Sequence, residues 1–301
     1  MKTKKWLKLN TSSLEGKTVL VSGSTGGIGR ELCEYLSALG ASLVLLDRNP
    51  EKSRRLADEL TSRHKGLSVA LVSADMEDPR SVKDACVKLK ELPIDVFISN
   101  AGAYSIPRKT CENGYDNVFQ INFVSPYIII NELLPSLRER KGRVVIVGSI
   151  AHNYSKSDSR DVDFSARQQS SLVYGNSKRY LMFVLNELFK NEPCVGFAIT
   201  HPGITFTNIT NHYPKLIYAI IKTPMKVIFP PPKRACLSIL KGVFEDTGDR
   251  EWIGPRLFGI WGKPKKTRLR TVGSSELEYF AKWNSDKTLP ERKKHAEKGI
   301  S

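Results

Sequence analysis

The sequence lacks any apolar run of roughly 18 residues, the length that a membrane-spanning helix needs. It also lacks a CxxC pair or a cluster of cysteine and histidine, which argues against the common zinc and disulfide frameworks. Its five cysteines are scattered and odd in number, so we expect reduced, mostly buried thiols and no metal site. The amino terminus has lysines but no apolar stretch of signal-peptide length, which favours a cytoplasmic protein.

Acidic residues are scarce, because 31 Asp and Glu stand against 47 Lys and Arg, for a formal net charge of +16. Such a surplus fits a nucleic acid, an anionic membrane, or an anionic cofactor and substrate. The sequence has no helix-turn-helix, zinc-finger or RNA-recognition pattern, so we expect no dedicated nucleic-acid binding. Peripheral membrane contact stays open, because lysines surround Trp6 and residues 213–229 combine aromatics with lysines.

What the sequence does contain is a repeated alternation of short apolar runs and helical patterns. The apolar runs cover 18–21, 43–46, 68–72, 96–98, 144–147 and 195–199, and the helical patterns cover about 27–40, 50–64, 79–91, 112–139 and 171–190. Continuous apolar runs suit strands that are buried on both faces of a parallel sheet. The alternation therefore predicts an α/β fold, a doubly wound parallel sheet of about seven strands with helices on both faces.

A single domain over residues 1–301 fits this length better than two full domains. After Pro202 the alternation stops. We expect a core over about 14–261, a substrate lid inserted over about 203–232, and a basic carboxy-terminal extension over about 262–301. Because the lid segment is apolar and aromatic, its composition favours a hydrophobic substrate.

A glycine-rich turn joins the first apolar run to the first helical pattern. Glycines allow the backbone to approach a pyrophosphate closely, and the N–H groups at a helix start face the anion. The position between a strand and a helix is the one that dinucleotide binding requires. The expected cofactor contacts in this turn are Gly23, Ser24, Thr25, Gly27, Ile28 and Gly29.

The two residues that directly follow the second apolar run, Asp47 and Arg48, affect the choice of dinucleotide. Asp47 stands about twenty residues beyond the glycines, where a carboxylate can accept hydrogen bonds from ribose hydroxyls and would repel a 2′-phosphate. This favours NAD. Arg48 follows at once and can neutralise a 2′-phosphate, which leaves NADP as the alternative.

Further motifs follow the glycine turn in a fixed order. They are Ser99-Asn100-Ala101-Gly102, Asn122, Ser149, Tyr174-Gly175-Asn176-Ser177-Lys178 and His201-Pro202-Gly203. Together with the turn they resemble the short-chain dehydrogenase/reductase family, from about residue 17 to residue 207. The resemblance implies a Rossmann-type fold. The long gap between Ser149 and Tyr174, which contains Asp163-Phe164, is most similar to the retinol-dehydrogenase-like branch.

The resemblance implies an NAD(P)-dependent oxidoreductase that interconverts an alcohol and a carbonyl on a small hydrophobic molecule. Tyr174 would be the general acid and base, and Lys178, one helical turn away, would lower its pKa. Ser149 would orient the substrate oxygen, and Asn122 would hold a water near the lysine. One alternative is a catalytically silent dinucleotide sensor, although it would not need all four residues. The other is a peripheral membrane-associated reductase of a lipid or retinoid type.

The resemblance also extends the set of cofactor contacts. It adds Asp75, Met76, Asn100, Ala101, Gly102, Tyr174, Lys178, Pro202, Gly203, Thr205 and Thr207. Ser22 and Ser99 stand where many relatives have Thr and Asn, and Thr205 stands where an aliphatic residue is commoner. Relatives often form dimers or tetramers, so a homo-oligomer is left open.

Overall fold

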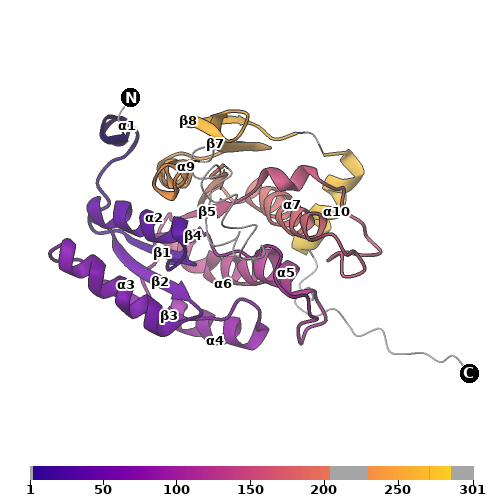
Figure 1. Ribbon diagram of the computed structural model, residues 1–301, viewed down its shortest axis with the longest axis horizontal. Coiled ribbons are helices and arrows are strands. Elements are labelled where there is room, and N and C mark those ends of the chain that lie inside the picture. Colours follow the sequence, from indigo (N-terminus) through magenta and orange to yellow (C-terminus); the bar gives the residue numbers. More distant parts are fainter. Residues whose placement is uncertain (1–2, 204–229, 271, 286–301) are drawn as a thin grey trace, which may run out of the picture.

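The computed structural model describes residues 3–203, 230–270 and 272–285, and it has one sheet through its centre (Figure 1). In the described residues the sheet has eight strands in the order β3-β2-β1-β4-β5-β6-β7-β8. They are β1 (Thr18–Ser22), β2 (Ser42–Asp47), β3 (Val69–Ser73), β4 (Val96–Ser99), β5 (Arg143–Val147), β6 (Gly196–Thr200), β7 (Glu251–Leu257) and β8 (Trp261–Arg268). The first seven run parallel, and β8 is antiparallel to β7. The predicted doubly wound sheet is confirmed, with one strand more than expected.

Strands β1, β2, β4, β5 and β6 are apolar along nearly their whole length because helices cover both faces of the sheet. In β1, Leu20 packs into the core on one face, and Val19 and Val21 pack into the core on the other. Side chains alternate between the faces of a strand, so burial on both sides requires a continuous apolar run. This is the pattern from which the strands were predicted.

The helices divide between the two faces. One face carries α1 (Thr3–Asn10), α2 (Gly27–Ala38), α3 (Pro50–Arg63) and α9 (Pro232–Phe244), and the other carries α4 (Pro79–Lys90), α6 (Ser125–Glu139), α7 (Ser170–Phe189) and α10 (Ser274–Ser285). Helices α3 and α4 begin alike: the side chains of Asn49 and Asp78 accept a backbone N–H, and a proline follows each of them.

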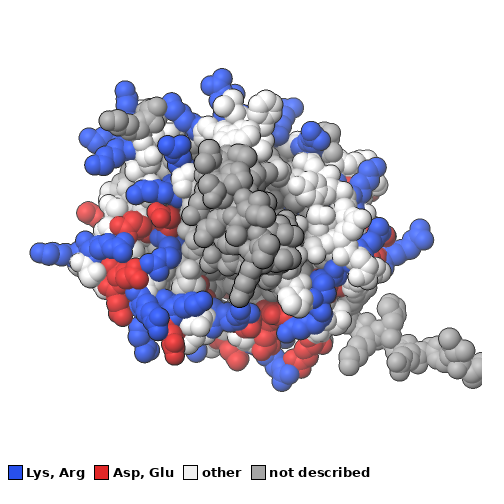
Figure 2. Space-filling model, viewed as in Figure 1, with Lys and Arg blue, Asp and Glu red and all other residues white. Residues whose placement is uncertain are grey.

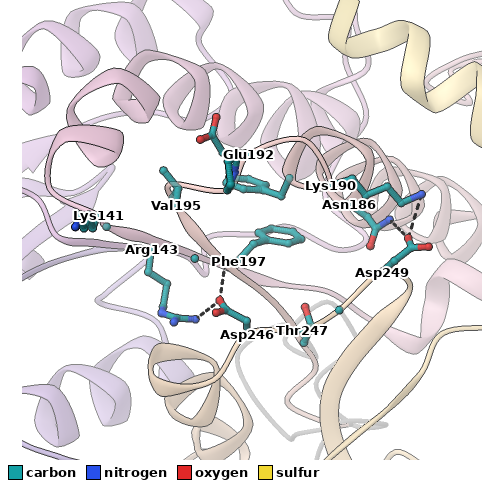
Figure 3. Close-up of a pocket in the computed structure, with 15 residues that line it drawn as sticks. Lys141, Arg143, Asn186, Lys190, Glu192, Val195, Phe197, Asp246, Thr247 and Asp249 are labelled. Carbon is teal, nitrogen blue, oxygen red and sulfur yellow. Dashed lines mark hydrogen bonds and ion pairs between the residues drawn. The ribbon is translucent and has the colours of Figure 1, made fainter.

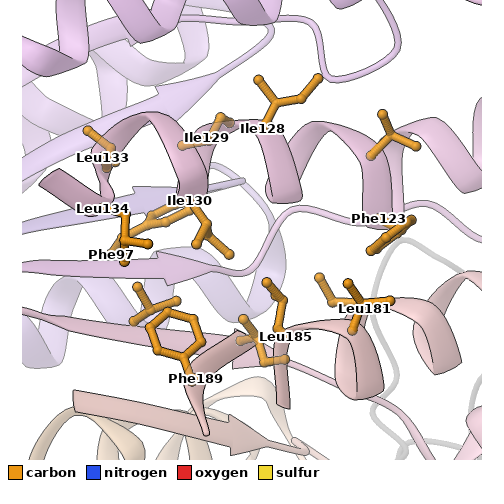
Figure 4. Close-up of a cluster of buried hydrophobic side chains, with 14 of the residues drawn as sticks. Phe97, Phe123, Ile128, Ile129, Ile130, Leu133, Leu134, Leu181, Leu185 and Phe189 are labelled. Atoms are coloured by element: carbon orange, nitrogen blue, oxygen red, sulfur yellow. The ribbon is translucent and has the colours of Figure 1, made fainter. Parts of the chain in front are cut away.

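The largest apolar cluster lies between the sheet and helices α6 and α7 (Figure 4). Phe97 of β4 meets Ile130 and Leu134 of α6, while Leu185 and Phe189 project from α7. All five are buried. This packing fixes α7 against the sheet, which matters because α7 carries Tyr174 and Lys178.

The sheet and its covering helices continue past residue 261. Strand β8 pairs with β7 over Glu251–Leu257, and α10 lies on α7. The rings of Phe280 and Trp283 lie 5.1 and 5.3 Å from the ring of Tyr180. Residues 261–270 and 272–285 therefore pack with the core, where the sequence suggested a basic extension.

Three other sequence-based expectations meet the structure here. Trp6 is 4% exposed, so it is a core residue and not a membrane contact. The expected lid over 203–232 lies, apart from residues 203 and 230–232, outside the described residues. Among the helices of the described ranges, none combines the length and the apolar character that a bilayer crossing demands.

Candidate active site

The candidate site residues gather where the strands end. Strands β1 and β4 are neighbours in the sheet, although β2 and β3 separate them in the sequence. Such a switch in strand order opens a crevice at the carboxyl ends of the strands, where ligands bind in open α/β sheets. Gly23 follows β1, Asn100 follows β4, and Ser149 follows β5 at this same edge.

The glycine turn has the close packing expected of a phosphate cradle. A Cβ atom on Gly29 would lie 2.2 Å from the Gly23 carbonyl oxygen, and one on Gly23 would lie 2.9 Å from Ala101 Cα. Gly26 occupies the N-cap of α2 and has no side chain with which to cap it. The first N–H groups of α2 are thus left for an anion, so these residues fit a dinucleotide pyrophosphate.

Asn100 holds this turn in place. Its side-chain amide donates to the carbonyl oxygens of Ser22 and Gly23, both at 3.0 Å. The hydroxyl of Ser22 accepts the backbone N–H groups of Asn100 and Ala101, both at 3.1 Å. The serine that replaces the commoner threonine therefore still ties the two strand ends together.

Asp47 is engaged by the turn itself. The carboxylate accepts hydrogen bonds from the hydroxyls of Ser24, Thr25 and Ser53 and from the backbone N–H of Thr25. A carboxylate has about four lone-pair sites, so these donors occupy its capacity. Arg48, by contrast, has a side chain that is 71% exposed and lies 4.0 Å from Asp75.

Asn122 lies in a π-helical turn, η1 (Gln120–Val124), between the short helix α5 (Asn117–Phe119) and α6. Its amide accepts from Ala103 N at 3.0 Å and donates to Ala103 O at 2.8 Å. A Cβ on Gly102 would lie 2.9 Å from Asn122 Oδ1 and 3.5 Å from Lys178 Nζ. Asn122 and Lys178 thus both lie beside Gly102. The segment around Asn122 is a π-helical turn, where the sequence predicted a regular helix. Turns of this kind often mark functional sites.

Ser149, Tyr174 and Lys178 come together from β5 and α7. The Ser149 hydroxyl lies within hydrogen-bonding reach of the Tyr174 phenol. Lys178 Nζ lies 5.9 Å from the centroid of the Tyr174 ring and donates to Val147 O at 2.9 Å. Lys178 is buried, and burial lowers its pKa to about 8.

The protonation of Tyr174 differs from the sequence-based expectation. Burial raises the pKa of Tyr174 to about 12, and the hydrogen bond with Ser149 opposes this rise only in part. Lys178 donates to a backbone carbonyl, so its charge does not dominate the phenol. At neutral pH the phenol therefore holds its proton.

Two aromatic side chains that sequence reasoning missed border Tyr174. The ring of Tyr104 meets the ring of Tyr174 edge to face, with 5.2 Å between centroids. Tyr154 is 53% exposed and also contributes to the raised pKa of Tyr174. Tyr104 follows Gly102 by two positions, which was the available signal.

Two buried histidines lie behind Ser149. His152 Nδ1 is 2.6 Å from the Ser149 carbonyl oxygen, and His201 Nε2 is 2.9 Å from the Gly259 carbonyl oxygen. Trp252 of β7 packs between them, with its ring 5.5 Å from His152 and 4.8 Å from His201. Burial lowers the pKa of each histidine to about 4, so both are neutral at pH 7.

The remaining predicted contacts are placed unequally. Met76 and Pro202 are buried, Asp75 is half-buried, and Gly203 has a positive φ of 85°. Thr205 and Thr207 lie outside the described residues. Within the described ranges, no group of three His, Cys, Asp or Glu side chains is arranged to hold a metal ion.

A separate pocket opens near the amino ends of β5 and β6, at Arg143 and Gly196, away from this site (Figure 3). Its charged groups are largely paired with one another: Arg143 Nη1 lies 2.6 Å from Asp246, and Lys190 Nζ lies 3.1 Å from Asp249. These ion pairs tie the segment before β7 to β5 and α7. We therefore assign the pocket a structural role.

The fold and this crevice together define a dinucleotide-binding α/β protein. A family model described as short chain dehydrogenase matches residues 17–159. The chain is 30% identical over 201 residues to the DnrU protein of Streptomyces sp. (strain C5), covering 65% of this chain and 68% of that relative. The chain belongs to the short-chain dehydrogenase/reductase family.

Other relatives extend the same picture. The family member FEY of Arabidopsis thaliana is 30% identical over 243 residues, and human retinol dehydrogenase 13 is 26% identical over 207 residues. The matches cover 76% and 67% of this chain but only 64% and 62% of those relatives, so the chain spans less than two thirds of their length. The predicted family is confirmed, and its relatives include retinol dehydrogenases.

Solved structures show the same fold. A Mycobacterium paratuberculosis protein superposes with a TM-score of 0.69 at 23% identity, covering 91% of this chain and 96% of its own. A short-chain dehydrogenase from Sphingobium yanoikuyae in complex with NADPH gives a TM-score of 0.58 at 21% identity, covering 75% and 84%.

Proposed function

We propose that this protein interconverts an alcohol and a carbonyl with NAD(P), and that Tyr174 exchanges the proton with the substrate oxygen. One observation carries the proposal: a phenol that meets a serine hydroxyl at the carboxyl edge of a dinucleotide-binding sheet, with a buried lysine beside it. A bound nicotinamide supplies or accepts the hydride. The protein's own side chains provide everything else.

Tyr174 and Ser149 act on the oxygen of the substrate. The hydroxyl of Ser149 donates a hydrogen bond to that oxygen and fixes it beside the phenol. Because the pKa of Tyr174 is about 12, the phenol is protonated at neutral pH and is ready to act as a general acid. The site is thus prepared for carbonyl reduction at neutral pH, and alcohol oxidation gains as the pH rises.

Lys178 and Asn122 support this proton transfer. An ammonium has three donors, and one of them is used by Val147 O, which leaves two for the cofactor ribose and for a water. Asn122 keeps the 102–103 backbone beside Lys178 through its paired hydrogen bonds with Ala103. The residues that would hold the dinucleotide are those of the glycine turn, Asn100 and Lys178.

The substrate in this proposal is hydrophobic. Tyr104 and Tyr154 flank the phenol, and Ile150 follows Ser149 directly. The apolar composition of residues 203–232 agrees with such a substrate, as does the name of retinol dehydrogenase 13, a protein named for a hydrophobic alcohol.

The dinucleotide in this proposal is either NAD or NADP, with NADP bound at least as well. The sequence alone favours NAD through Asp47. That reason is weaker once the Asp47 carboxylate is occupied by Ser24, Thr25 and Ser53. Arg48 is 71% exposed and its only ion pair among the described residues, with Asp75, is at 4.0 Å, so the guanidinium can turn toward a 2′-phosphate.

Replacement of the phenol tests the reaction. The Tyr174→Phe variant should lose about 100-fold to 10,000-fold in kcat, while its dinucleotide affinity changes little. Tyr35→Phe is the matched control, because the Tyr35 hydroxyl lies on α2 against Lys233 O and far from the site. A panel of hydrophobic ketones and alcohols with both dinucleotides is the assay. Full activity in Tyr174→Phe would refute the mechanism, and binding without turnover in the wild type would support the silent sensor.

A further inference from the structure

The turn between β7 and β8 carries apolar side chains that are exposed to different extents. Phe258 is 88% exposed, Leu257 is 53% exposed and Trp261 is 40% exposed. We call residues 257–261 the hairpin tip. Strands β7 and β8 lie at the top of Figure 1, and in the same view in Figure 2 the surface there is uncharged, with Lys and Arg around it. Exposed apolar groups that gather in this way usually mark a binding surface.

The backbone conformation of the hairpin tip disfavours a phenylalanine at position 258. The N–H of Ile260 donates to Leu257 O at 3.0 Å, and the two central residues have positive φ, 52° at Phe258 and 67° at Gly259. Positive φ at both centres is the pattern of a type I′ turn, in which asparagine, aspartate or glycine is preferred at the first centre. A phenylalanine in that position costs conformational energy and contributes little packing.

Basic side chains flank the hairpin tip. Between residues 251 and 270 the chain has six Lys and Arg and one Glu. Arg256, Lys263, Lys265 and Arg268 are exposed and form no ion pair with other described residues, whereas Lys266 pairs with Glu245. The hairpin tip therefore presents exposed apolar side chains with positively charged side chains around them, at the carboxyl end of β7.

We propose that the hairpin tip docks the protein on an anionic lipid surface. Phe258 and its neighbours would enter the interface between headgroups and acyl chains, and the flanking cations would meet the anionic headgroups. A second copy of this chain is a poorer occupant, because a stable dimer needs roughly 800 Å² per partner and three side chains provide far less. A nucleic acid would use the cations and could stack a base on Phe258, but it gives no role to the exposed aliphatic side chain of Leu257.

The hairpin tip also stands at the edge of the sheet that holds the candidate active site. A Cβ on Gly259 would lie 3.4 Å from Ile150 Cγ2, and the Gly259 carbonyl oxygen meets His201. Docking would thus turn the edge with Ser149 toward the bilayer. If the proposed function holds, a substrate dissolved in the bilayer has a short path to Tyr174. The docking itself does not depend on that function.

Flotation of the full-length protein with vesicles tests the proposal without any measurement of turnover. The vesicles are phosphatidylcholine alone or phosphatidylcholine with about one third phosphatidylserine, at low and high salt. We expect binding to the anionic vesicles at low salt, with a marked loss at high salt. The Phe258→Asn variant should bind about tenfold less tightly, and because asparagine suits positive φ it should fold at least as well. Lys263→Ala/Lys265→Ala should also bind at least about tenfold less tightly.

Matched controls lie on α4, on another part of the surface. Val87 is 64% exposed, and Val87→Asn and Lys83→Ala/Lys88→Ala remove the same kinds of group. Both should bind like the wild type. The proposal is overturned if the wild type does not float with anionic vesicles at low salt, if it floats equally with neutral ones, or if Phe258→Asn binds as tightly as Val87→Asn. Binding to single-stranded RNA but not to vesicles would likewise overturn it in favour of a nucleic-acid partner.

Discussion

Arg179 and Glu276 form a buried, two-point ion pair that joins α7 to α10. Nε and Nη2 of Arg179 each lie 2.6 Å from an oxygen of Glu276, and the two side chains are 8% and 13% exposed. Arg179 also donates to His152 O at 2.9 Å, and Glu276 accepts the N–H and hydroxyl of Ser157. Helix α10 thereby fixes the segment that follows Ser149.

Removal of one partner should destabilise the protein strongly. Burial alone would raise the pKa of Glu276, but the hydrogen bonds from Arg179 and Ser157 hold that pKa below its usual value. Glu276→Gln leaves the Arg179 guanidinium buried without its counter-charge, and we expect a loss of about 3 kcal/mol in the free energy of unfolding. Urea denaturation measures it. Glu132→Gln, which breaks an exposed pair with Lys90, should cost little, and an equal loss there would contradict the argument.

Acid should destabilise the folded state through the histidines behind Ser149. The folded pKa of His152 and of His201 is about 4, below the usual 6.5, so the unfolded chain takes up the protons first. Stability is therefore lost as the pH falls from about 6.5 toward 4, by about 2 kcal/mol for each histidine at pH 5. Melts between pH 7 and pH 5 should show a weaker pH dependence in His152→Asn/His201→Asn than in the wild type. The same slope in both proteins would exclude this origin.

The glycine turn should not tolerate a methyl group at its tightest point. A Cβ on Gly29 would meet the Gly23 carbonyl oxygen at 2.2 Å and Ser24 Cα at 2.8 Å, and both are backbone atoms. Gly29→Ala should therefore shift the turn, weaken dinucleotide binding and cost about 1–3 kcal/mol of stability. A fluorescence titration of the dinucleotide is the measurement. Gly273→Ala meets open space and serves as the control, so a similar loss in both variants would point away from the turn.

The choice of dinucleotide should depend on Arg48. In the Arg48→Ala variant we expect the KM for NADP to rise about tenfold, the size of one lost charge-assisted hydrogen bond, and the KM for NAD to change little. Arg55→Ala removes an exposed arginine from α3 and should leave both values unchanged. A larger rise for NAD than for NADP would show that the ribose hydroxyls, and not a 2′-phosphate, are bound at this position.

Most of the strand positions, and the gathering of the site residues at one edge of the sheet, are predictable from the sequence. Apolar runs located the first six of the eight described strands. Residues at strand ends, such as Ser149 and Asn100, were expected at one edge because parallel strands end together. Tyr174 and Lys178 were expected on one face of a helix because they are four residues apart in the sequence. These features depend on short-range periodicity, which a single sequence displays.

Features that depend on contacts between distant segments were not predictable in this way. The pairing of β8 with β7 is a local hairpin contact, and it was missed for a different reason: the residues of β8 are basic, so they read as part of a tail. The ion pair of Arg179 with Glu276 joins residues far apart in the chain, and no periodic pattern records it. The protonation of Tyr174 depends on burial beside Tyr104 and Tyr154, which only the folded chain reveals.

The π-helical turn at Gln120–Val124 makes the site sensitive to chain length as well as to residue identity. A π turn holds one residue more than an α turn, and a helix advances about 100° with each residue. Deletion of a single residue between Asp116 and Ser125 would rotate Asn122 away from Ala103 without changing any site residue. A substitution at another position of this segment leaves Asn122 in place, whereas an insertion or a deletion moves it, so the site depends on the length of the segment as well as on its residues.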